Sequence, residues 1–236
     1  MNLPMIVILL IMLGAFIPAG TAATGRGDAE ALSLVAKARA HYAQVESLRA
    51  EFTQTYTAGF ARDEEKGVVF YKKPARMYWE YKEPTEKYLI ANGEKAYFYI
   101  PRDKQVLVYN ISGSEDRLFL FFFGGRDPAT DFQIEFETEL APLVSGNHLL
   151  RLSPLQVDGF ISHLLLEIER KTFKIRRLIS VETLGQRNDY VLNNVEENVS
   201  IPNRRFQFRV PKGVEVIRQD QEIPASSSLY WIESNE

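Results

Sequence analysis

The chain has 236 residues, 45% of them hydrophobic and 25% charged, with 28 lysines and arginines against 31 aspartates and glutamates. The resulting net charge of −3 gives no reason to expect a nucleic-acid partner, because neutralising phosphates needs a basic excess. The sequence contains no cysteine, which excludes from it disulfides, thiol nucleophiles, iron–sulfur clusters and zinc sites held by cysteine.

Residues 1–23 predict an export signal. Leu3–Ile17 is apolar apart from one proline and one glycine, and no charged side chain occurs before Arg26. The run is shorter than the roughly 20 residues that cross a bilayer, and small residues form a cleavage zone ending at Ala22 or Ala23. Because Met1-Asn2 lacks a basic side chain, a short uncleaved anchor is the alternative. We expect cleavage and a periplasmic location, where a packed domain needs no disulfide.

One amphipathic helix is expected from about Ala29 to Val45, with Asp28 as its N-cap. Its apolar residues recur at helical spacing and share one stripe: Leu34, Ala38, Tyr42 and Val45. Such a stripe is typical of a helix that packs against a core.

From Leu48 the apolar pattern changes to a period of two, which predicts β-strands. Met77, Trp79 and Tyr81 alternate with polar or charged neighbours. Asn92-Gly93 is a strong hairpin signal. About six antiparallel strands are therefore expected between Leu48 and Tyr109.

The alternation stops between Ser112 and Gly125. Six large apolar residues, Leu118–Phe123, lie between a capping-box pattern that begins at Ser112 and a pair of glycines. The pattern fits a short helix, and a buried strand is the alternative. As a helix this segment is apolar all round, so it has to be covered on more than one face.

Strands resume after Asp127-Pro128. We expect them over Phe132–Thr138, His148–Ser153, Ser162–Lys171, Lys174–Thr183, Tyr190–Val195 and Phe206–Arg209. No linker divides the chain, so residues 24–219 are expected to form one domain, mainly β with helices. Its expected architecture is a single curved antiparallel sheet of about eleven strands, an incomplete barrel covered by a helical lid. Residues 220–236 are expected to form a loosely attached tail.

No catalytic constellation is visible in the sequence. The three histidines show no metal-ligand spacing, and neither a nucleophile elbow nor a phosphate-binding loop occurs. The pairs Glu135/Glu137 and Glu167/Glu169 alternate as solvated faces do, so no desolvated acid–base pair is marked. We therefore expect neither enzymatic activity nor a cofactor.

The strands favour an apolar binding surface instead. Large side chains are expected on one face of the curved sheet: Phe52, Phe70, Met77, Trp79, Tyr81 and Tyr99. A hydrophobic cavity and a solidly filled core are both compatible with this pattern.

The order and spacing of several motifs are similar to those of a known family. The motifs are Ser47–Gln54 (SLRAEFTQ), Tyr71–Tyr81 (YKKPARMYWEY) and Leu89–Pro101 (LIANGEKAYFYIP). This series resembles the LolA family of periplasmic lipoprotein carriers, strongly from about Asp28 to Val108 and more weakly to about Val214.

The resemblance implies an incomplete barrel of eleven strands with a helical lid. It also implies a hydrophobic cavity that shields the acyl chains of lipoproteins between the inner and the outer membrane. The implied partners are acylated lipoproteins, an inner-membrane ABC complex that releases them and an outer-membrane LolB-like acceptor, and the carrier is expected to be a monomer. Exposed acyl chains cost about 0.8 kcal/mol per CH₂ in water, so such a carrier needs a dry concave surface.

Ligand contacts are then expected from the six side chains named above and from lid residues: Lys73, Leu118, Phe119, Phe121 and Phe122. Two positions depart from the family pattern. Lys73 stands where members commonly carry an arginine that bonds to the lid backbone, so closure should be less firmly latched. Met77 stands where an aromatic residue is common, and methionine suits irregular apolar ligands. Two other functions stay open: a binder of another lipid or hydrophobic ligand, and a periplasmic sensor domain of the same architecture.

Overall fold

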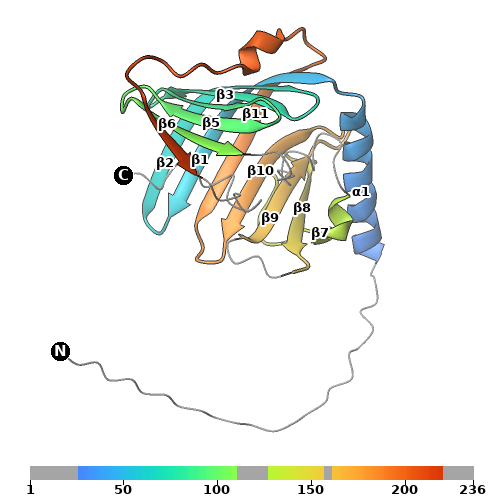
Figure 1. The fold of residues 1–236 in the computed structure, drawn as a ribbon. Coiled ribbons are helices and arrows are strands. Elements are labelled where there is room, and N and C mark those ends of the chain that lie inside the picture. The colour runs from blue at the N-terminus through green and yellow to red at the C-terminus, as the bar shows by residue number, and fades with distance from the viewer. Residues whose placement is uncertain (1–25, 111–126, 157–160, 220–236) are drawn as a thin grey trace, which may run out of the picture.

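A computed structural model describes residues 26–110, 127–156 and 161–219 of the chain (Figure 1). The elements follow in the order α1 (Arg26–Ala43), β1 (Ser47–Ala58), β2 (Ala61–Lys72), β3 (Arg76–Glu83), β4 (Lys87–Ala91), β5 (Lys95–Ile100), β6 (Gln105–Asn110), β7 (Phe132–Phe136), β8 (His148–Pro154), β9 (Ile161–Ile168), β10 (Ile175–Glu182), β11 (Arg187–Glu197) and β12 (Glu215–Gln219). Two short 3₁₀ helices, η1 (Pro128–Thr130) and η2 (Asn203–Phe206), precede β7 and β12. The predicted signal (1–23), the predicted tail (220–236) and the predicted helix Leu118–Phe123 lie outside the described residues.

The twelve described strands form one sheet in the order β12-β6-β5-β4-β3-β2-β1-β11-β10-β9-β8-β7. Because β12 and β7 are two separate edges, the sheet stays open, which confirms the predicted incomplete barrel. It curves strongly, and α1 stands beside the β7–β9 end (Figure 1). Neighbours pair antiparallel, except that β12 runs parallel to β6. The expectation of a purely antiparallel sheet is therefore wrong at this edge, and the strand number is twelve rather than about eleven.

The predicted strand Phe206–Arg209 is also wrong. Phe206 ends η2, and the following residues pair with no strand. They belong to the segment that connects β11 to β12 along the chain, residues 198–214, which we call the strap. It passes across the sheet from one strand to the other (Figure 1). The strap is held by side chains: the Phe208 ring lies 5.3 Å from the rings of both Tyr97 and Tyr99. A segment in which apolar and polar residues alternate can thus pack on a sheet without becoming one of its strands.

Helix α1 packs against the core as its apolar stripe predicts. Leu34, Ala38 and Tyr42 of α1 are buried in the main core cluster, as is Val45, which lies two residues beyond the end of the helix although it was predicted within it. The Tyr42 hydroxyl accepts a hydrogen bond from the backbone N–H of Ile175 at 3.0 Å, which joins the helix to β10. The helix begins at Arg26, so Asp28 lies within its first turn and is not the N-cap.

A half-buried ion cluster joins α1 to the ends of two strands. The Glu197 carboxylate contacts His41 Nε2 at 2.8 Å and Lys174 Nζ at 3.0 Å. Burial works to raise the pKa of Glu197, but the hydrogen bonds from His41 and Lys174 outweigh it and the pKa is lowered. A carboxyl with a lowered pKa stabilises the fold above its ordinary pKa, and this contribution is lost as the pH falls through the lowered value.

We therefore expect Glu197→Gln to lower the free energy of unfolding by about 1 kcal/mol at about pH 7. The difference from the wild type should shrink as the pH falls through the lowered pKa, because the wild-type carboxyl then becomes protonated as well. Urea unfolding at neutral pH and over a series of acidic pH values measures this. A deficit of equal size throughout the series would show that the ion cluster does not carry the effect.

We call the face of the sheet that shares its core with α1 the inner face, and the opposite one the outer face. Leu48, Ala50 and Phe52 of β1 lie on the inner face. Residues directly opposite in register share a face, so the row through Phe52 continues to Gly67 of β2 and Tyr81 of β3. The period of two predicted from Leu48 onward therefore sets which side chains reach the interior.

Candidate hydrophobic binding site

An aromatic cluster occupies the inner face over β1 and β3. The Phe52 ring lies 4.8 Å from that of Trp79 and 4.9 Å from that of Tyr81, both edge to face. Tyr190 of β11 lies 5.7 Å from Trp79. Phe52 is only 2% exposed and Trp79 6%. Of the predicted site residues, the structure thus brings Phe52, Trp79 and Tyr81 together.

The apolar inner face continues from this cluster to the β12 edge. Met77 is buried on it, two residues before Trp79. Register carries the row from Trp79 through Leu89 to Phe98 and Leu107, and these last two belong to a second buried cluster that Ile217 of β12 contacts. An unbroken apolar strip thus crosses six neighbouring strands, from β1 to β6 by way of β2, β3, β4 and β5, and reaches the sheet edge.

Phe70 and Tyr99 are not part of this surface. Phe70 pairs with Tyr78 on the outer face, where the Arg205 guanidinium of η2 stacks on its ring at 4.0 Å. Tyr99 stacks with Tyr88 and contacts Phe208 of the strap. Their predicted place beside Phe52 is wrong because each lies an odd number of residues from an inner-face position of its own strand, and successive side chains of a strand alternate in direction.

Lys73, in the turn between β2 and β3, contacts the C-terminal end of α1. Its Nζ donates a hydrogen bond to the Ala43 carbonyl at 2.8 Å and lies 3.5 Å from Glu46 Oε1. A cation at this position satisfies a free helix-end carbonyl and complements the helix dipole. The side chain therefore ties the β2–β3 turn to the helix. The other predicted lid residues, Leu118, Phe119, Phe121 and Phe122, lie outside the described residues, so their role and the latch stay predictions.

We expect Lys73→Met to lower the free energy of unfolding by about 1 kcal/mol, because it removes a charge-assisted bond to a helix-end carbonyl. Lys73→Arg is the matched control, since its guanidinium can still donate there. Chemical denaturation of both variants tests this. Equal losses in the two would mean that the lysine stem, not the bond to Ala43, stabilises the junction.

Polar side chains interrupt the inner face two residues beyond Phe52. Gln54 of β1 lies opposite Glu65 of β2, and Glu65 Oε1 contacts Lys87 Nζ at 2.6 Å. The ammonium lies 5.0 Å from the centre of the Tyr81 ring. Burial raises the pKa of Glu65, although the bond from Lys87 opposes it. We call Gln54, Glu65 and Lys87 the polar row. Gln54 follows Leu48, Ala50 and Phe52 at the same spacing of two, so a polar residue at a position expected to face the core was the sequence signal for this row. The sequence-based prediction did not include it.

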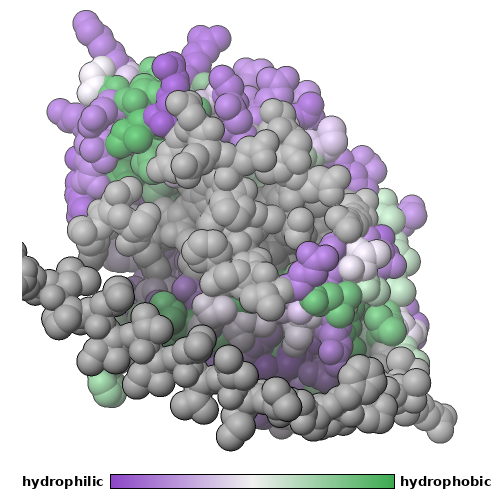
Figure 2. All heavy atoms as spheres, turned by 60° about the horizontal axis from the view of Figure 1, so that its bottom comes forward, coloured by the Kyte–Doolittle hydropathy of each residue, from purple (hydrophilic) through white to green (hydrophobic). Residues whose placement is uncertain are grey.

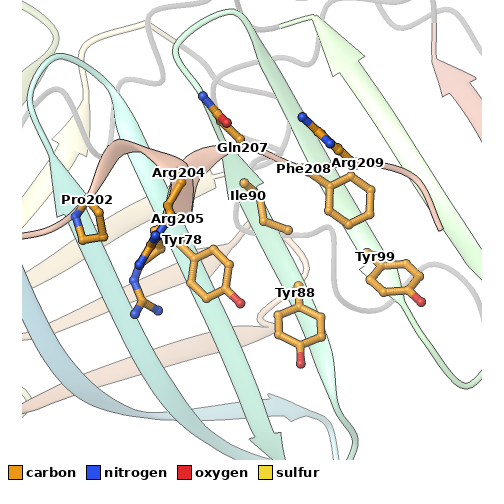
Figure 3. A pocket seen from close by; sticks show the side chains of 10 residues that line it. All are labelled: Tyr78, Tyr88, Ile90, Tyr99, Pro202, Arg204, Arg205, Gln207, Phe208 and Arg209. Atoms are coloured by element: carbon orange, nitrogen blue, oxygen red, sulfur yellow. The ribbon is translucent and has the colours of Figure 1, made fainter.

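A second feature that the sequence analysis missed is an outer-face pocket of about 580 Å³ between the strap and β3–β5. In Figure 3 the rings of Tyr78, Tyr88 and Tyr99 form a row beneath the strap. The pocket is lined by these three and by Ile90, Pro202, Arg204, Arg205, Gln207, Phe208 and Arg209. It lies on the face opposite the aromatic cluster.

Two acids predicted to be solvated are in fact structural. Glu167 is fully buried and accepts hydrogen bonds from the backbone N–H groups of Leu143 and Val144 and from Asn147 Nδ2, at 2.7–3.1 Å. The side chain of Glu137 is also buried, and its carboxylate bonds Arg151 at 2.7 Å. Both acids hold the β7–β8 loop in place, because a loop packed over outer-face strands has to satisfy its polar groups there.

The surface of the described part is largely polar on the side seen in Figure 2. Hydrophilic residues dominate it, and hydrophobic ones gather in a few separate places. Among the described residues, no group of His, Asp and Glu is arranged to hold a metal ion. The one α-helix in these ranges is not long and apolar enough to cross a membrane.

Comparison with known proteins agrees with this fold and with the sequence motifs. Outer-membrane lipoprotein carrier proteins of Idiomarina loihiensis and Hahella chejuensis are 29% and 28% identical to it over 73% and 74% of the chain, covering 82% and 83% of their own lengths. A crystal structure of an uncharacterized conserved protein from Thermus thermophilus shares the fold at 11% identity, with a TM-score of 0.53 over 80% of this chain and 99% of that one. The model of the family described as outer membrane lipoprotein carrier protein LolA matches residues 43–209, more than half of the sequence, and the chain belongs to this family.

Proposed function

We propose that this chain is a periplasmic carrier that binds the acyl chains of lipoproteins on the inner face of its sheet. In this proposal it receives lipoproteins from an inner-membrane ABC complex and delivers them to a LolB-like acceptor at the outer membrane. The observation that carries the proposal is the buried apolar strip that runs from the Phe52–Trp79 cluster to the open edge at β12. The names of the relatives, outer-membrane lipoprotein carrier proteins, support the same cargo.

The energetics of the cargo explain why such a strip is needed. Each CH₂ of an acyl chain gains about 0.8 kcal/mol when it leaves water for an apolar surface. Aromatic rings and Met77 supply that surface without specific polar contacts, so chains of different length can be accepted. Transfer then needs only different affinities along a series of partners and no chemical step.

Trp79 provides a direct test because it lies within the proposed surface. The chain has two tryptophans, so a Trp231→Phe variant leaves Trp79 as the only indole emitter. We expect a triacylated lipopeptide to shift its fluorescence saturably, and the same peptide without acyl chains to leave it unchanged. No response to either peptide, or equal responses to both, would contradict binding of acyl chains at the inner face.

A further inference from the structure

Within the part of the chain that the structure describes, the polar row contains two buried acceptor atoms without a hydrogen-bond partner. They are Gln54 Oε1 and Glu65 Oε2. Gln54 is only 1% exposed, and the two residues are directly opposite across β1 and β2, where Cβ atoms lie about 5 Å apart. Leaving such atoms unpaired is costly, and buried polar groups without partners are rare in folded proteins. A pair of them side by side points to a hydrogen-bond donor brought in by a ligand.

The charge of the row indicates which kind of donor fits. Glu65 already has a cationic partner, since Lys87 Nζ contacts its other oxygen at 2.6 Å. A second ammonium group would lie close to Lys87 and be repelled at low dielectric. A neutral N–H donor has no such penalty, and Gln54 is itself neutral. The row therefore fits amide N–H groups better than a free amino group.

The position of the row relates it to the apolar strip. Gln54 follows Phe52 on the same face of β1, and Lys87 lies over the ring of Tyr81, which contacts Phe52. A ligand with its chains along the aromatic cluster would thus place the first polar atoms of its head beside the row. In a lipoprotein those atoms include the amide that joins an acyl chain to the N-terminus and the next peptide N–H, which supply two neutral donors.

We propose that the polar row binds the amide N–H groups of an N-acylated cargo terminus, with Gln54 Oε1 and Glu65 Oε2 as acceptors. This inference rests on the proposed carrier function and adds a specificity-determining site to it: the protein would select amide-linked acyl chains over ester-linked ones. Neither the family motifs nor the names of the relatives assign this role to these residues.

The test compares two probes that differ in one group. One is a palmitoylated dipeptide with an amide link, and the other is its analogue in which an ester oxygen replaces the N–H. We expect the wild type to bind the amide probe about tenfold more tightly, the size of one to two buried hydrogen bonds. In Gln54→Leu the preference should fall several-fold, with the affinity for the ester probe retained. Gln207→Leu on the strap is the control and should keep the full preference.

Thermal unfolding without ligand separates this role from a structural one. Gln54→Leu should melt at the wild-type temperature or higher, because it removes a buried acceptor that has no partner. Equal wild-type affinity for both probes would overturn the inference and leave the carrier proposal standing. A loss of both affinities to the same degree in Gln54→Leu would also overturn it. Binding of neither probe would overturn the inference and the carrier proposal together. The wild-type comparison decides the question even if the variant fails to fold.

Discussion

Gly67→Ala is expected to destabilise the protein by about 3 kcal/mol or more, enough to abolish most soluble folded protein. A Cβ at Gly67 would lie 2.0 Å from the backbone carbonyl oxygen of Glu80 and 2.7–2.8 Å from two ring atoms of Phe52. The carbonyl belongs to the neighbouring strand β3, so it cannot move without breaking the ladder. The ring packs edge to face against Trp79 and Tyr81 in the aromatic cluster, so it has little room to move away.

Gly59→Ala is the matched control for this substitution. Gly59 lies at the β1–β2 turn with a φ of +57°, and a Cβ there meets nothing within 4 Å. Its cost should be about 1 kcal/mol, the ordinary penalty of a left-handed backbone for alanine. Soluble yield and urea unfolding of both variants measure the difference. Equal stabilities would contradict the close approach of the Glu80 carbonyl and the Phe52 ring to Gly67.

Lys87→Met should be the second most damaging change, with a loss of about 3 kcal/mol near neutral pH. The side chains of Lys87 and Glu65 are only 9% and 14% exposed and form a direct ion pair. Removing the cation leaves a buried carboxylate without a counter-charge, and breaking a buried pair costs far more than losing a surface one. Lys66→Met is the control, because Lys66 pairs with Glu64 in an exposed position.

The loss should depend on pH in a definite direction. Burial already raises the pKa of Glu65, and Lys87 holds it down, so the substitution raises it further. A carboxyl whose pKa is raised by folding binds its proton more tightly in the folded state, and stability then increases as the pH falls through the raised value. The deficit of Lys87→Met should therefore shrink between about pH 8 and about pH 5. A deficit that stays constant or grows over this range would contradict the account of the pair.

The sequence predicts the fold well because the strands alternate. The period of two places Phe52, Met77, Trp79 and Tyr81 on one face, and the turn signals divide the chain close to the observed strand ends. The helix boundary differs by three residues at its start, since residues before a polar cap position can extend a helix when the core holds it.

The missed features are those that depend on contacts between distant segments. Alternation within one strand cannot place Phe70 relative to Phe52, because that needs the register between β1 and β2, in which Phe52 lies opposite Gly67 and Phe70 lies opposite Arg49. Phe208 shows the alternation of a strand, yet its partners are Tyr97 and Tyr99 on the outer face. Glu167 shows the pattern of a solvated acid, but a loop from elsewhere in the chain covers it.

The most direct test of the carrier proposal is release of newly made lipoproteins from spheroplasts of the native host. Purified protein would be added to spheroplasts that synthesise radiolabelled lipoproteins, and the soluble fraction would be analysed for label that co-purifies with it. The account predicts a soluble complex between the carrier and acylated lipoprotein, which then passes to outer-membrane vesicles. Labelled lipoprotein that stays in the membrane fraction, with correctly folded protein present, would contradict it.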